Sequence, residues 1–195
     1  MSVPALRGPS PKAPGTPQKT ITELLTQWAD LTNAAIAATG NTEGWFRGSI
    51  QDNKPWDPAA EDVSLPPCGT VGSKTAHQVS NSVTHHAFEA DPHPIVDKLT
   101  AFFESQGFTV ERTVDWKSRT GEMDVAIRAT RPDGVFYGLG VTSEIVAIDV
   151  SSECSIHPSI DTWARERSLR NLNTPPPSPA ASGGTEDTDD GSFWG

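Results

Sequence analysis

Residues 108–150, FTVERTVDWKSRTGEMDVAIRATRPDGVFYGLGVTSEIVAIDV, decide the fold that we expect for this chain. Apolar and polar side chains alternate through the first nine of these residues and again through 123–129, which is typical of half-buried strands. The tetrapeptide RPDG at 131–134 has the composition of a tight turn. A further strand begins at Val135, and another covers 145–150. Consecutive strands with short links predict an antiparallel meander.

Two amphipathic helices precede this meander. Thr20 and Glu23 have the spacing of a capping box, apolar residues then recur at helical spacing, and Gly40 supplies a stop. A second apolar stripe lies within 91–107, and a weaker strand pattern covers 76–89. We therefore expect an α+β fold, an antiparallel β-meander of four to five strands with two helices packed on one face.

The chain divides into one domain and two tails. Residues 1–19 are rich in Pro, Gly, Ser and Thr, so we expect a disordered linker there. Residues 20–170 form the expected α+β domain. Residues 171–195 contain a proline cluster and four carboxylates with no cation, which is typical of a disordered acidic tail. The final Phe193-Trp194 is either a short docking motif or part of an unstructured end.

The charge and the hydropathy of the chain argue against a nucleic-acid partner and against a membrane span. A formal net charge of −10 and a pI near 4.8 repel phosphate backbones, so we expect no nucleic-acid partner. No apolar run approaches the roughly 18–20 residues of a membrane span, so we expect none in this chain. Residues 1–18 lack the apolar segment of a signal peptide. We therefore expect a cytoplasmic protein if Met1 is the true start.

The two cysteines, Cys68 and Cys154, lie near the opening and at the close of the patterned region. We interpret them as one disulfide that pins a long loop to the end of the last strand. Disulfides persist in oxidising compartments, so this interpretation places the folded protein outside the cytosol. The alternative is a pair of buried free thiols in a cytosolic protein.

A catalytic interpretation pairs Cys154 with His157 as nucleophile and base. On a strand, residues three apart fall on opposite faces, and no third group is evident to orient the base. Asp149 interrupts an apolar strand, but an edge position or a salt bridge to Arg128 accounts for it. We therefore expect no catalytic residue and no cofactor.

Four of the five histidines, His77, His85, His86 and His93, fall within a short stretch and raise the question of a metal site. On a strand His85 and His86 point to opposite faces, and His77 lies about 27 Å from His85 at the usual rise per residue. We therefore expect no metal site.

Residues 41–72 form a long segment rich in Pro and Gly that carries Trp45, Phe46 and Trp56. A loop of this length in a compact domain usually needs a tether, which Cys68 supplies. The aromatic side chains either line a groove for a ligand such as a sugar or cover the core.

The layout resembles the mature domains of small actinobacterial lipoproteins of unknown function. The resemblance covers about residues 20–158 and includes a Pro-Pro-Cys-Gly loop at 66–69, a helix that ends at Gly107-Phe108, the meander, and Ser-Ser-Glu-Cys at 151–154. It implies a domain outside the cytoplasmic membrane, joined by a flexible linker to a lipid-modified cysteine. No cysteine precedes Cys68. Either the anchor is encoded upstream of Met1, or the domain has been trimmed, or the protein has lost its anchor. The resemblance implies no catalytic residue.

These observations predict a non-enzymatic, extracytoplasmic binding or accessory domain of a bacterial cell envelope, stabilised by one disulfide. Its partner is an unidentified protein or small ligand. The alternative is a cytosolic acidic interaction protein of an immunity or inhibitor type, with free thiols and a basic partner. A third interpretation is an enzyme with a site around His85 or Asp149.

Overall fold

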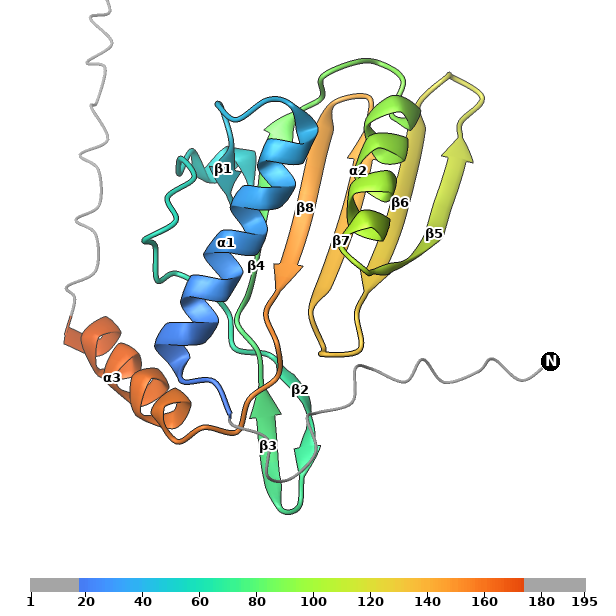
Figure 1. The fold of residues 1–195 in the computed structure, drawn as a ribbon. Helices are drawn as coiled ribbons and strands as arrows, with labels where there is room; N and C mark the ends of the chain where they lie inside the picture. Colours follow the sequence, from blue (N-terminus) through green and yellow to red (C-terminus); the bar gives the residue numbers. More distant parts are fainter. Residues whose placement is uncertain (1–17, 174–195) are drawn as a thin grey trace, which may run out of the picture.

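The computed structural model describes residues 18–173. Within them, an antiparallel sheet of six strands has the order β1-β4-β8-β7-β6-β5 (Figure 1). The expected α+β fold is confirmed. The strands of this sheet are β1 (Phe46–Arg47), β4 (Ser80–His86), β5 (Thr109–Lys117), β6 (Met123–Thr130), β7 (Phe136–Thr142) and β8 (Ile145–Ser151).

Strands β5 to β8 form the predicted meander, and β4 pairs with β8 as a fifth neighbour. Val83, Ile148, Leu139 and Ile127 lie side by side across four strands and are all buried. The row of small side chains beside them, Thr84, Ala147, Gly140 and Ala126, points to the opposite side of the sheet because successive residues of a strand alternate between faces.

Helices α1 (Ile21–Thr39) and α2 (His93–Ser105) lie on the same face of the sheet, as predicted (Figure 1). The predicted capping box starts α1: the Glu23 amide donates to Thr20 Oγ1, and the Thr20 amide donates to the Glu23 carboxylate at 2.7 Å. Gly40 ends α1 at φ 83°, a left-handed conformation that glycine adopts readily. We call the opposite face of the sheet, on which no helix of residues 18–173 packs, the open face.

A β-bulge in β5 corrects the predicted alternation of that strand. Arg112 pairs with Ile127, but Val114 pairs with Ala126, so Thr113 is an extra residue in β5. The extra residue moves Val114 and Trp116 to the open face, where they are 37 % and 56 % exposed. The prediction that both side chains belong to the buried face was therefore wrong.

The single strand predicted over 76–89 is two strands. Strand β3 (Lys74–His77) pairs with β2 (Pro67–Val71) in a separate hairpin, and β4 begins after a step at Gln78-Val79. The step is fixed by Ser152, whose hydroxyl accepts from the Val79 amide and whose amide donates to the Val79 carbonyl, both at 2.9 Å. The short 3₁₀ helix η1 (Ile50–Asp52) and β1 lie in the long segment that had been expected to be a loop.

A third helix, α3 (Ser159–Asn173), was not predicted. It lies against the start of α1, where the Ile21 amide donates to Ser159 Oγ at 2.9 Å, and Ile160 is buried. The helix extends three residues beyond the boundary expected at residue 170. Most of the two tails, including Phe193-Trp194, lies outside the described residues. No helix among residues 18–173 is long and apolar enough to cross a membrane.

Candidate functional site

The expected disulfide between Cys68 and Cys154 is present, and it joins β2 to the chain that follows β8. The two Cα atoms are 6.0 Å apart, within the range that a disulfide spans. Beside it, His77 and Ser155 exchange both backbone hydrogen bonds, at 2.9 and 2.8 Å. The bond and this bridge together attach the β2-β3 hairpin to the end of the sheet. Cys154 is therefore not a free thiol in this structure, which agrees with setting aside its pairing with His157 as a nucleophile.

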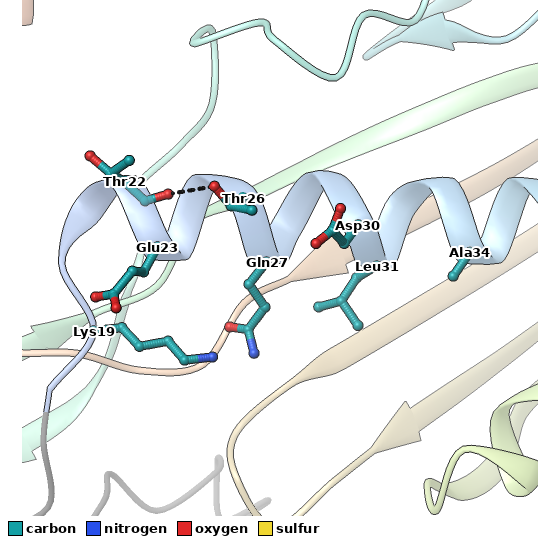
Figure 2. A pocket seen from close by; sticks show the side chains of 8 residues that line it. All are labelled: Lys19, Thr22, Glu23, Thr26, Gln27, Asp30, Leu31 and Ala34. Atoms are coloured by element: carbon teal, nitrogen blue, oxygen red, sulfur yellow. Dashed lines mark hydrogen bonds between the residues drawn. The ribbon is translucent and has the colours of Figure 1, made fainter.

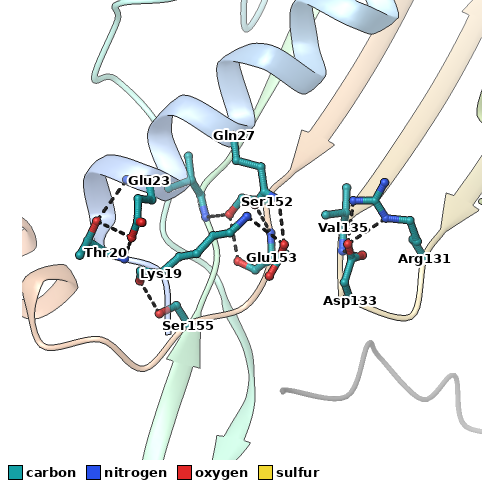
Figure 3. Close-up of polar contacts among 11 residues, drawn as sticks. Lys19, Thr20, Glu23, Gln27, Arg131, Asp133, Val135, Ser152, Glu153 and Ser155 are labelled. Carbon is teal, nitrogen blue, oxygen red and sulfur yellow. Dashed lines mark hydrogen bonds and ion pairs between the residues drawn. The ribbon is translucent and has the colours of Figure 1, made fainter. Parts of the chain in front are cut away.

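Glu153 is a nearly buried carboxylate directly before Cys154, with 7 % of its surface exposed. It accepts from Lys19 Nζ at 2.9 Å and from Gln27 Nε2 at 3.0 Å, and its amide donates to Gln27 Oε1 at 3.0 Å (Figure 3). Ser155 Oγ donates to the Lys19 carbonyl at 2.7 Å. These contacts attach the first turns of α1 to the disulfide, so we assign them a structural role.

A shallow hollow lies along the exposed side of α1. Within the described chain its lining comes from α1 and from Lys19, which directly precedes the helix cap (Figure 2). The exposed polar side chains on it include Glu23, Thr26 and Asp30. Because the described lining consists of one convex helix and the adjacent Lys19, the described residues give the hollow no converging walls of the kind found in small-molecule sites.

A better-walled cavity of about 400 Å³ lies beside the disulfide, and we call it the junction cavity. Three segments form its walls: β3, the four residues after Cys154, and the first turn of α3. Both hydrophobic and polar side chains contribute. Its lining residues are Lys74, Thr75, His77, Ser155, Ile156, His157, Pro158, Ile160 and Asp161.

Hydrogen bonds fix the orientation of both imidazoles in this cavity. His77 Nδ1 lies 3.1 Å from the Leu65 carbonyl, so this nitrogen carries a proton. His157 Nδ1 accepts from the Ser159 amide at 3.2 Å, so in the neutral ring the proton is on Nε2. In the described part of the chain, neither Nε2 atom has a hydrogen-bond partner. The junction cavity is therefore the candidate functional site.

The aromatic residues predicted as a ligand groove lie elsewhere. Trp45 is 3 % exposed and donates from Nε1 to the Asn41 carbonyl at 2.8 Å. Trp56 packs edge to face on Trp28, with ring centroids 5.3 Å apart. Phe46 lies on β1 at the sheet edge. This placement favours the alternative in which these rings cover the core, and a ligand groove over them stays a prediction.

Asp149 lies in β8, between β4 and β7, so the edge position considered for it is wrong. Desolvation raises the pKa of its carboxyl above the usual range. Arg128 does not pair with it among the described residues, because the guanidinium of Arg128 lies over the Phe136 ring, 5.1 Å from the centroid. Asp149 therefore faces the open side of the sheet with no cation beside it in residues 18–173.

The other histidines do not converge. His93 binds Asp91 and Asp115 across α2 and β5, whereas His85 contacts the Glu43 carbonyl and the Asn41 side chain. Among residues 18–173 there is no group of three His, Cys, Asp or Glu side chains arranged to hold a metal ion. His77 and His157 of the junction cavity are thus the two histidines that share one cavity.

Sequence reasoning missed the junction cavity because it missed the β2-β3 hairpin and α3. One signal was available: Gly72-Ser73 separates two short strands by two residues, which is a typical hairpin connection. Joined to the Cys68–Cys154 bond, that hairpin brings Lys74 and His77 beside the residues that follow Cys154.

Comparison with known proteins gives a likeness of fold. The structure is similar to the crystal structure of a DUF4853 family protein from Actinomyces odontolyticus, with a TM-score of 0.50 and 13 % sequence identity, over 75 % of this chain and 74 % of that one. No family model matches the sequence. No curated protein matches it either. At this identity the likeness shows only that the two proteins share a fold. The neighbour is an actinobacterial protein of a DUF family.

Proposed function

We propose that this chain is a non-enzymatic binding or accessory domain that works outside the cytoplasm, at a bacterial cell envelope. The observation that carries the proposal is the bond between Cys68 and Cys154. Structural disulfides form and persist in oxidising compartments and are rare in the cytosol. The bond joins residues 86 positions apart, so it constrains most of the described domain.

The position of the bond also supports a binding role. It holds the β2-β3 hairpin against the chain after β8, and these two segments form walls of the junction cavity. A site whose walls are fixed before binding loses less entropy when the ligand binds. The sulfur of Cys154 is bonded to Cys68, so the proposal gives it no catalytic role.

The lipoprotein-like part of the proposal rests on the resemblance of residues 20–158 to mature lipoprotein domains. The fold likeness to an Actinomyces protein agrees with that resemblance at the level of fold alone. We propose a lipid anchor encoded upstream of Met1.

Localisation in the native bacterium tests this proposal. The gene with its native upstream region would carry a C-terminal epitope tag, and intact cells would be treated with an added protease. We expect the tag to be lost from intact cells while a cytosolic marker protein is retained. Retention of the tag until lysis would contradict the proposal and support the alternative, a cytosolic acidic interaction protein.

A further inference from the structure

The junction cavity has an arrangement of donors that indicates its ligand. We propose that it binds a small organic anion, with one carboxylate or phosphate group and a compact apolar body. This inference deepens the proposed binding role and rests on it. The volume of the junction cavity, about 400 Å³, lies in the range of small-molecule sites.

The walls of the junction cavity are held in place by bonds within the chain. The backbone bridge between His77 and Ser155 joins two of its walls, and the disulfide lies next to that bridge. The His157 amide donates to Ser155 Oγ at 3.1 Å, which fixes the turn into α3. A ligand therefore meets a rigid frame.

The junction cavity has hydrogen-bond donors that an anion can use. Lys74 is an exposed residue of the cavity lining, and no ion pair to it is found within residues 18–173. His157 Nε2 is a donor, because Nδ1 of the same ring already accepts from Ser159. Ammonium and imidazolium donors bind carboxylate and phosphate oxygens through charge-assisted hydrogen bonds.

The rest of the cavity lining includes apolar side chains and one carboxylate. Ile156, Pro158 and Ile160 provide apolar surface for the body of the ligand. Asp161 is the one carboxylate in the described lining, and it opposes an anion. The lining therefore contains one lysine and two histidines but only one carboxylate. This local composition differs from that of the whole chain, whose formal net charge is −10.

The test uses benzoate, whose charge is constant between pH 6 and 8, and inorganic phosphate as a bare oxyanion. Titration of the full chain would be followed by the NMR signals of the His77 and His157 imidazoles. We expect saturable shifts with benzoate, weaker binding of inorganic phosphate, and no binding of benzylammonium.

Matched variants separate a site from general electrostatics. We expect Lys74→Met to weaken benzoate binding about tenfold, which corresponds to loss of one charge-assisted hydrogen bond. Lys54→Met makes the same charge change at an exposed position outside the cavity lining and should leave binding unchanged. Asp161→Asn should tighten binding severalfold. Circular dichroism would establish that each variant is folded.

Two results would overturn the inference. One is the absence of saturable imidazole shifts with either anion at pH 6. The other is an equal loss of affinity in Lys74→Met and Lys54→Met, which would mean that the anion responds to total charge. Either result leaves the disulfide and the localisation experiment unaffected, so failure of the anion site is distinguishable from failure of the extracytoplasmic proposal.

Discussion

Gly138 and Asp149 are directly paired on β7 and β8, and a Cβ atom on Gly138 would lie 3.2 Å from Asp149 Oδ2. The same Cβ atom would lie 3.3 Å from Phe136 Cζ. Gly140, two residues along the same face of β7, has nothing within 4 Å of such an atom. The two glycines therefore differ in the space available above them.

This difference predicts opposite effects for two matched variants. Gly138→Ala should destabilise the domain by about 1–3 kcal/mol, because Phe136 and Asp149 must shift to make room. Gly140→Ala should leave stability unchanged or raise it by up to about 1 kcal/mol, because alanine restricts the unfolded chain. Urea unfolding followed by circular dichroism measures both. Equal effects of the two substitutions would contradict the packing described for the open face.

A second prediction concerns Glu153, which holds the start of α1 to the disulfide. Glu153→Gln should destabilise the domain by about 1–3 kcal/mol, because Lys19 loses its charged partner at a nearly buried site. A double-mutant cycle with Lys19→Met should give a coupling energy of about 1 kcal/mol or more. Denaturant unfolding of the unmodified protein, the two single variants and the double variant measures this coupling energy.

The control for that cycle is the exposed pair Arg112–Asp97, whose side chains are 38 % and 69 % exposed. Solvent screening should limit the coupling energy of this pair to about 0–1 kcal/mol. A coupling for Lys19 and Glu153 no larger than that of the exposed pair would contradict the structural role assigned to Glu153.

A third prediction concerns His93, whose ring nitrogens contact Asp91 at 2.7 Å and Asp115 at 3.2 Å. Hydrogen bonds to Asp91 and then to Asp115 raise the pKa of His93 above its usual value of 6.5. The folded state therefore binds the proton more tightly than the unfolded state does. The resulting stabilisation is fully present below the unfolded-state pKa and is lost as pH rises through the folded-state pKa.

NMR titration of the His93 ring checks the direction of this shift. Asp115→Asn should lower the pKa of His93, because one of its two carboxylate partners becomes a neutral amide. Asp124→Asn is the matched control, since Asp124 pairs with Trp116 and lies on the opposite face of the sheet from Asp115. A His93 pKa at or below the usual value in the unmodified protein would show that the two contacts do not form in solution.

Local patterns were sufficient to predict α1, α2 and the meander. The capping box at Thr20 and Glu23, the stop at Gly40 and the alternation through 123–129 each act within a few residues, so the sequence displays them directly. The disulfide followed from the presence of two cysteines and from the position of Cys154 after the last strand.

Features that depend on distant partners could not be predicted. The bulge at Thr113 leaves the alternation of β5 intact in sequence, and pairing with β6 alone reveals that Val114 and Trp116 have changed face. The position of β4 beside β8 depends on contacts between residues 59 to 71 positions apart, from His86–Ile145 to Ser80–Ser151. Helix α3 is rich in charged and polar residues and buries Ile160, so it shows little apolar periodicity.

A fourth prediction concerns the stability that the disulfide supplies. The bond closes a loop of 86 residues, and the chain-entropy model assigns such a loop roughly 4–5 kcal/mol. The Cys68→Ser, Cys154→Ser double variant should therefore unfold at a clearly lower urea concentration than the oxidised protein. Reduction of the unmodified protein should reproduce this loss. No change in the midpoint would mean that the hairpin is held by its other contacts alone.

The redox state of the two cysteines in the native organism tests the central claim most directly. Cells would be quenched in acid, and their proteins would be denatured and treated with a thiol-alkylating reagent without reductant. Mass spectrometry of the intact protein would then count the alkyl adducts. A disulfide-stapled extracytoplasmic domain predicts no alkyl adduct, and two adducts only after reduction. Two adducts without reduction would mean free thiols at Cys68 and Cys154 and would contradict the account.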